Sequence, residues 1–194
     1  VGGTRQVWNN DIQVFASNVA KAVFTSRDLP LSPLACGDVH FERFRYQRDR
    51  LSRLFASSLS AEDKLIESTT INKLRESIAR VERAKAKEIS KLRLRSPHLF
   101  SATYSATFFG IRQAIQADAI IASIRAANAS GRTTADEKRW CLVALGRALL
   151  KVSNSTGHFA QYLKPKSDNY HRYLALRRRS LWAEWLSSLT QISP

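Results

Sequence analysis

A polar stretch near the C-terminus, residues 153–166, gathers side chains of the kinds that contact nucleic acids. It holds hydroxyl groups, amides, one histidine, two aromatic rings and two lysines around a single glycine. Lysines and hydroxyls bind phosphate oxygens and aromatic rings stack on bases, so the composition suits a clamp on a phosphate backbone. A polar loop that covers the core, anchored by Phe159 and Tyr162, explains it equally well. The candidate DNA contacts in this stretch are Thr156, Gly157, His158, Phe159, Lys164 and Lys166.

Three consecutive arginines, Arg177, Arg178 and Arg179, lie further along the chain in a helical pattern. Successive residues of a helix point about 100° apart, so one or two of them could bind phosphate while another braces the bundle. Residues 151–194 carry seven basic and two acidic residues, an imbalance that an ordinary solvated surface does not show. We therefore expect phosphate contacts from this run.

Arg112 and Gln113 follow an aromatic turn, Phe108–Gly110, at the expected start of a helix. The N-terminus of a helix attracts anions, and these two side-chain types pair bidentately with guanine and adenine edges. Hydrogen bonding within the turn is the alternative for both residues, and it stays open at this stage.

The residue types that serve catalysis or metal binding show no recognised spacing. The four histidines form no HExxH pattern, Cys36 and Cys141 are far apart in sequence, and there is no GxSxG or CxxC motif and no Cys/His cluster. We expect no metal site and no hydrolase activity, and we expect a compartment that keeps the cysteines reduced. Asp118, flanked by apolar helix positions, is expected to cap or pair rather than to catalyse.

The chain of 194 residues has 31 basic and 16 acidic residues, which gives a formal net charge of +15. A surplus of this size attracts polyanions and suits phosphate neutralisation, although a basic surface kept for solubility is the simpler alternative. No apolar run approaches the roughly 20 residues that cross a bilayer, and no signal peptide is recognisable. We expect no membrane contact and a cytoplasmic location.

The elements that position these residues are expected to be helices. Seven glycines and five prolines are too few for a many-stranded, turn-rich fold. Apolar periodicity and capping signals predict a mainly α protein, a bundle of five to seven helices with at most one short N-terminal strand. The expected helices include residues 41–59, 60–92, 111–127, a segment from the Thr134–Glu137 capping box to Val152, and 170–189.

Four segments, taken in order, resemble the DNA adenine methylase family of N6-adenine DNA methyltransferases. These segments are Asn10–Gln13, Ser101–Gln113, Asn154–Pro165 and Arg177–Ser180. The resemblance implies a doubly wound domain that binds S-adenosylmethionine, interrupted by a helical target-recognition region, in an enzyme that methylates a flipped adenine. It also implies that Asp11 accepts hydrogen bonds from the cofactor ribose.

Two motifs of that family are absent from the chain. No Phe-x-Gly-x-Gly loop precedes Asp11, and no adjacent prolines exist to form a DPPY motif. The sequence, which begins at Val1 and has no methionine, is therefore interpreted as an internal piece of the enzyme. We expect it to contain no catalytic residues and to bind no S-adenosylmethionine by itself. Residues 1–36 would be a remnant of the α/β cofactor domain, and residues 37–194 the helical DNA-binding region.

The prediction is thus a helical region that contacts double-stranded DNA, binding phosphates through Lys164, Lys166 and Arg177–Arg179. Tyr104, Arg112, Gln113 and the loop 156–159 would help to position the target. One alternative is a stand-alone basic helical protein that binds nucleic acid without catalysis, and another is an assembly module that binds an acidic protein. Self-association through an exposed strand edge or apolar surface is also possible for a piece of a larger domain.

Overall fold

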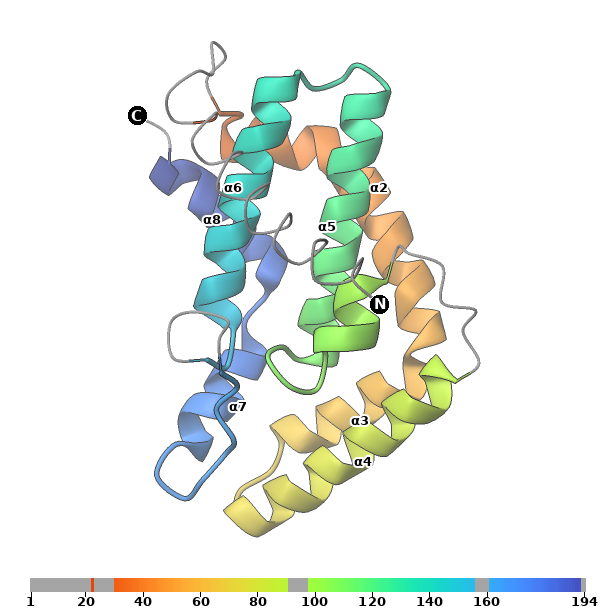
Figure 1. Ribbon diagram of the computed structural model, residues 1–194, viewed down its shortest axis with the longest axis vertical. Coiled ribbons are helices and arrows are strands. Elements are labelled where there is room, and N and C mark those ends of the chain that lie inside the picture. The colour runs from red at the N-terminus through yellow and green to blue at the C-terminus, as the bar shows by residue number, and fades with distance from the viewer. Residues whose placement is uncertain (1–21, 23–29, 91–97, 156–160, 193–194) are drawn as a thin grey trace, which may run out of the picture.

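The structure is a computed structural model that describes residues 22, 30–90, 98–155 and 161–192. These residues form a bundle of seven α-helices and one π-helical turn, with two isolated β-bridges and no strand (Figure 1). The prediction of a mainly α bundle is confirmed. The helices are α2 (Pro33–Leu54), α3 (Ala56–Ile66), α4 (Ile71–Ile89), α5 (Ile111–Ala129), α6 (Ala135–Val152), α7 (Tyr170–Arg178) and α8 (Leu181–Ile192), and the π-helical turn η1 is Phe100–Tyr104.

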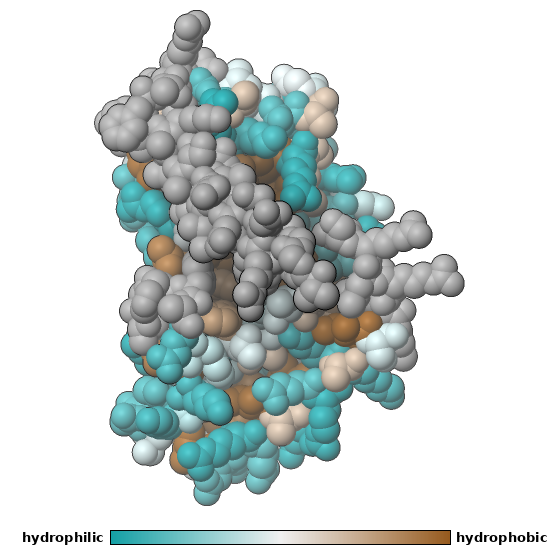
Figure 2. All heavy atoms as spheres, viewed as in Figure 1, coloured by the Kyte–Doolittle hydropathy of each residue, from teal (hydrophilic) through white to brown (hydrophobic). Residues whose placement is uncertain are grey.

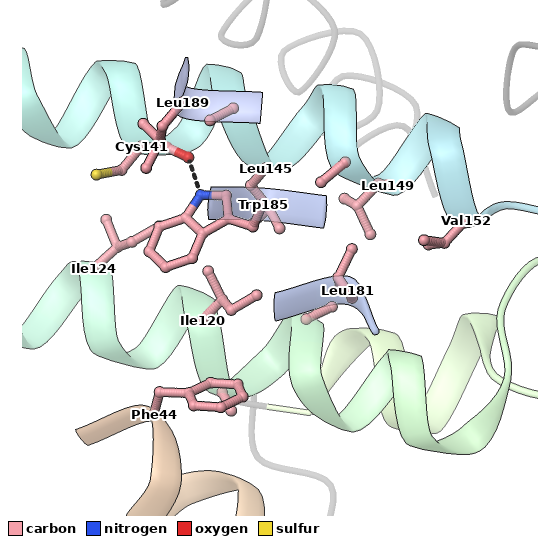
Figure 3. Close-up of a cluster of buried hydrophobic side chains, with 14 of the residues drawn as sticks. Phe44, Ile120, Ile124, Cys141, Leu145, Leu149, Val152, Leu181, Trp185 and Leu189 are labelled. Atoms are coloured by element: carbon pink, nitrogen blue, oxygen red, sulfur yellow. Dashed lines mark hydrogen bonds between the residues drawn. The ribbon is translucent and has the colours of Figure 1, made fainter. Parts of the chain in front are cut away.

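Helix α5 is the centre of the bundle. Its residues are small or apolar on nearly every side, and from Gln113 to Ile120 every side chain is buried. A helix that is apolar all round is stable only when other elements surround it. Helices α2, α6 and α8 pack around α5, and Trp185 of α8 is buried between α5 and α6 (Figure 3). The indole Nε1 of Trp185 donates a hydrogen bond of 2.9 Å to the carbonyl oxygen of Cys141.

A second apolar cluster lies under the first turns of α5. Helices α3 and α4 pack against each other beside α7, at the end of the molecule drawn lowest in Figure 1. Their apolar faces meet the first turns of α5, so α5 joins the two clusters into one bundle. The fully or nearly fully buried members of this cluster are Leu51, Phe55, Leu65, Leu74, Val81, Ala106, Ile111, Ile115, Tyr173 and Leu174.

The boundaries of α2, α3 and α4 differ from the prediction. The expected break at Ser60 is absent, because α3 runs through it, and the break falls instead at Phe55 and again before α4. Thr70 caps α4 by accepting a hydrogen bond from the backbone N–H of Lys73. The acidic residue that follows Ser60, Glu62, is used elsewhere in the fold, as described below. The spacing of Ser60 and Asp63 resembles a capping box, but no helix starts there.

The single helix expected over residues 170–189 is two helices. Arg179 has an extended backbone and ends α7, and the Ser180 hydroxyl accepts a hydrogen bond from the backbone N–H of Ala183 at the start of α8. The Gln113 side chain donates to the carbonyl oxygens of Leu176 and Arg179. The Leu176 carbonyl also accepts the backbone N–H of Arg179, so the contact from α5 adds to the bonds that end α7.

Two helices agree closely with the prediction. Helix α6 begins with the capping box: the Thr134 hydroxyl accepts from the N–H of Glu137, and the Glu137 carboxylate accepts from the N–H of Thr134. Helix α5 ends at Ala129, next to the predicted stop. None of the helices in the described part of the chain combines the length and the apolarity that a bilayer crossing requires.

The predicted domain boundary at residue 36 falls inside α2, and Cys36 belongs to the main apolar core. Residue 36 is therefore not a break in the chain's structure. The predicted N-terminal strand lies outside the described residues.

Candidate nucleic-acid interface

The start of α5 is held by a carboxylate from another helix. Glu62 of α3 is buried, and its Oε1 accepts the backbone N–H of Ile111 at 2.7 Å while its Oε2 accepts that of Arg112 at 2.9 Å. These are donors that the first turn of a helix leaves unpaired. Burial raises the pKa of Glu62, and the hydrogen bonds from Arg112 and Ile111 and the charge of Arg177 oppose that rise. The helix terminus proposed to face an anion is thus already occupied by a carboxylate of the protein.

Gln113 takes part in the same buried network. Only 1% of its surface is exposed; its Oε1 accepts the N–H of Gly110, and its Nε2 donates to the Leu176 carbonyl at 2.6 Å. The expectation that Gln113 helps to position a DNA target is wrong for this conformation, since its amide is inaccessible and fully used. The alternative of local hydrogen bonding around the turn is the one that the structure shows.

Arg177 is also a bracing residue. It is 2% exposed, and its guanidinium donates to the carbonyl oxygens of Thr107 at 2.7 Å and Phe108 at 3.4 Å. The same group lies over the ring of Tyr173, 4.5 Å from its centroid. Arg177 therefore binds no phosphate in this conformation, which corrects that part of the prediction. The expectation that one arginine of the run braces the bundle is met by this residue.

Arg112, Arg178 and Arg179 remain on the surface. Arg112 forms an exposed ion pair with Asp63 at 2.6 Å, which neutralises it. Arg178 donates to the carbonyl oxygen of Ile66 at the end of α3. Arg179 donates to the carbonyl of Lys151 and lies 3.8 Å from the Glu184 carboxylate. Of the three, Arg178 keeps its positive charge without an acidic partner in the described part of the chain.

Lys164 and Lys166 are exposed, and neither ammonium group makes a hydrogen bond or ion pair with the described residues. Asn169 fixes the turn that carries them: its Oδ1 accepts the N–H of Lys166 at 2.8 Å, and its Nδ2 donates to the Lys164 carbonyl. The turn therefore has a defined backbone and free cationic side chains, which is what a phosphate contact needs.

Tyr104 ends η1 and packs in a series of aromatic rings. Its ring centroid lies 5.7 Å from that of Phe100 and 6.2 Å from that of Phe108, and it is partly buried. The structure does not bring Tyr104 together with the lysines of the 164–166 turn in any contact. Asp11, Thr156, Gly157, His158 and Phe159 lie outside the described residues.

Asp118 acts as the sequence suggested, as a cap. Its carboxylate accepts the backbone N–H groups of Phe100 and Ser101 and the hydroxyl of Ser101, at 2.6 to 3.1 Å. Burial raises its pKa, and these hydrogen bonds oppose the rise. Both carboxylate oxygens of Asp118 thus accept hydrogen bonds that hold η1 against α5.

The exposed residues of α7 and of the turn before it are rich in lysine and arginine, and we call these cations the α7 basic face. At about 100° per residue, the exposed positions 171, 172, 175, 178 and 179 fall within an arc of about 120°. Figure 2 shows hydrophilic residues over the lower end of the molecule. Arg172 was missed by sequence reasoning, although its seven-residue spacing from Arg179 places both on one side of a helix. The α7 basic face consists of Lys164, Lys166, Arg172, Arg178 and Arg179.

A different group of chemically active side chains lies within the upper core. Cys36 and His40 of α2 and Cys141 of α6 are all buried, and their potential ligand atoms lie within 4.8 Å of one another. We expected no Cys/His cluster because these residues are not close together in the sequence. That expectation is wrong, since the fold brings the three side chains together. The signal that could have found half of it is the four-residue spacing of Cys36 and His40, which places both on one side of a helix.

Comparisons of the chain with protein-family models, with curated proteins and with solved structures found no match.

Proposed function

We propose that this chain binds double-stranded DNA, with the α7 basic face lying along the phosphate backbone. One observation carries the proposal: residues 161–179 contain six lysines and arginines and a single carboxylate, Asp168, and all of the cations except Arg177 are exposed. Arg179 pairs with Glu184, and the other exposed cations have no acidic partner among the described residues. Such a surface attracts a polyanion and gains affinity by releasing counterions from it. The net charge of +15 gives the same sign to the field of the whole chain.

The dimensions of the surface suit this partner. Helix α7 has nine residues, so it is about 13 Å long, which is the axial rise of about four nucleotides of one strand. Lysines and arginines on such a surface contact phosphates whatever the base sequence is. The proposal therefore predicts binding that depends strongly on salt and weakly on sequence.

This DNA contact is the role that the resemblance to adenine methyltransferases suggests for the region, and methyl transfer from S-adenosylmethionine stays a prediction about a longer protein. The contact itself needs no cofactor. We place the chain in the cytoplasm, where such DNA is accessible and where Cys36 and Cys141, which form no disulfide, would stay reduced.

The test is a salt titration of DNA binding by fluorescence anisotropy, with two unrelated duplex sequences. The variant Lys164→Gln/Lys166→Gln removes two free cations from the α7 basic face. We expect weaker binding to both duplexes and a slope of log Kobs against log salt that is smaller by about 2, because each phosphate contact contributes about 0.9.

The matched control is Arg125→Gln/Arg132→Gln, which removes the same charge from exposed positions at the opposite end of the bundle (Figure 1). We expect this variant to keep the wild-type slope. An equal loss in both variants would assign the effect to net charge alone and refute the proposed surface. Absence of DNA binding at moderate salt, with an acidic protein still bound, would favour the assembly module instead.

A further inference from the structure

The buried cluster of Cys36, His40 and Cys141 connects two helices that are neighbours of α5. Cys36 and His40 lie one turn apart on α2, and Cys141 faces them from α6, 101 residues beyond His40. The Cys141 Sγ lies 3.8 Å from His40 Nε2, and each of the three residues is at most 1% exposed. The cluster thus brings together two sulfurs and an imidazole nitrogen from two chain segments, out of contact with bulk water.

The surroundings of His40 leave its imidazole poorly satisfied. Its Nδ1 is buried and has no hydrogen-bond partner among the described residues, and Nε2 has only the distant sulfur of Cys141. The ring packs against the indole of Trp185 at 5.5 Å between centroids. A polar ring buried without strong hydrogen bonds costs free energy. A metal ion would give Nε2 a strong partner, while the ring proton would stay on Nδ1.

The donor set fits zinc in both geometry and charge. Zinc binds thiolate sulfur at about 2.3 Å and imidazole nitrogen at about 2.0 Å, which at a tetrahedral angle separates sulfur from nitrogen by about 3.5 Å. Cys141 Sγ and His40 Nε2 are 3.8 Å apart, so this pair needs a shift of a few tenths of an ångström, and the separations to Cys36 Sγ are at most 4.8 Å. Two thiolates and a neutral imidazole balance the charge of a divalent ion, whereas monovalent copper would leave one negative charge buried.

We propose that Cys36, His40 and Cys141 bind one Zn²⁺ ion, with both sulfurs as thiolates and His40 neutral. Three protein ligands leave the fourth tetrahedral position to an exogenous ligand such as water. Each thiol that is protonated before binding releases its proton to solvent. The ion would join the first turns of α2 to α6 and add its binding free energy to the stability of the bundle.

The two sulfurs alter each other's pKa. A hydrogen bond from Cys36 lowers the pKa of Cys141 to about 6, and the hydrogen bond from His40 acts in the same direction. The same contact with Cys141 and burial raise the pKa of Cys36. The two sulfurs are thus close neighbours, as two ligands of one metal ion must be.

The experiment uses the whole chain, reduced and freed of metal with a chelator that is then removed. Cobalt(II) is titrated first, because its visible absorption reports thiolate ligands, and zinc then displaces it. We expect one metal ion per chain, and a rise in Tm on addition of zinc. Cys36→Ser and His40→Gln should lower the affinity at least tenfold, in line with the loss of a ligand. His171→Gln, a change at an exposed histidine on α7, should leave it unchanged.

A measurement on the unmodified chain keeps the test valid if a variant fails to fold. X-ray absorption at the zinc edge should show two sulfur ligands at about 2.3 Å and one or two lighter ligands at about 2.0 Å. Zinc bound with no sulfur ligand would overturn the proposal. So would a reduced chain that takes up no zinc, or one whose cysteines form a disulfide with zinc present. None of these results depends on whether the α7 basic face binds DNA.

Discussion

Glu62 of α3 caps α5, a helix that begins 49 residues later: its Oε1 accepts the backbone N–H of Ile111 at 2.7 Å. The same carboxylate meets Arg112 through its N–H and Arg177 through its charge. This contact closes the lower cluster of the bundle against the central helix. It also explains why several residues that looked able to bind DNA are buried instead.

Replacing Glu62 by Ala should lower the free energy of unfolding by about 2 kcal/mol, because two buried N–H groups lose their acceptor. The measurement is urea unfolding followed by circular dichroism. Asp63→Ala is the matched control, since Asp63 is the next residue and forms an exposed ion pair with Arg112. Its expected cost is below about 1 kcal/mol. An equal loss in the free energy of unfolding for the two variants would show that the Glu62 cap stabilises the protein no more than the exposed Asp63 ion pair does.

Gly110 is expected to tolerate no side chain. A Cβ at this position would collide with Oε1 of Glu62 and lie 3.1 Å from Cδ of Arg177. Gly110→Ala should therefore destabilise the protein by about 1–3 kcal/mol through overpacking. Gly37→Ala is the control: Gly37 lies in α2 with open space around it, so alanine should stabilise by about 0.5–1 kcal/mol. The measurement is the Tm of thermal unfolding. A change of Tm in the same direction for both variants would contradict this packing of Gly110.

Stability should depend on pH through Asp118, whose pKa is raised by burial. The folded state then keeps the proton to a higher pH than the unfolded state, where the pKa of aspartate is about 3.9. At pH values between the unfolded and the folded pKa of Asp118, the folded state binds more protons than the unfolded state. The free energy of unfolding therefore falls as the pH rises. Glu62, whose pKa burial also raises, contributes in the same sense.

The free energy of unfolding is measured by urea unfolding at a series of pH values from acidic to neutral. For Asp118→Asn it should decline less steeply with pH than for the wild type. The variant loses the charged acceptor of Ser101 and starts from a lower stability, so the comparison is of slopes. Asp168→Asn, an exposed change in the turn before α7, should keep the wild-type slope. An Asp118→Asn slope identical to that of the wild type would disprove the assignment.

Arg177 and Arg178 are adjacent but should respond differently to substitution. Arg177→Gln removes buried hydrogen bonds and a ring contact, so we expect a loss of about 2–3 kcal/mol in the free energy of unfolding. Arg178→Gln should change stability by less than about 1 kcal/mol and lower the salt slope of DNA binding by about 1. Unfolding curves and anisotropy titrations of the two variants separate these effects. A large stability loss for Arg178→Gln would reverse the assignment.

The sequence by itself determined the helical character of the bundle and several local boundaries. The capping box of Thr134 and Glu137 predicted the start of α6, and the apolar pattern after Gly110 predicted α5. These signals work because a cap and a helical repeat involve residues within a few positions of each other. The positive charge was equally evident, since it is a property of composition alone.

Only the tertiary structure decided which polar residues are available for function. Arg177 and Arg178 are the same residue type in one run, yet the first is buried against the turn between η1 and α5 and the second is exposed. Glu62 lies in the middle of α3, yet it caps a helix that begins 49 residues later. Cys36 and Cys141 meet because α2 and α6 pack near each other beside α5, an arrangement that no local pattern encodes. Burial and proximity depend on contacts between distant segments, and those contacts form only when the whole core packs.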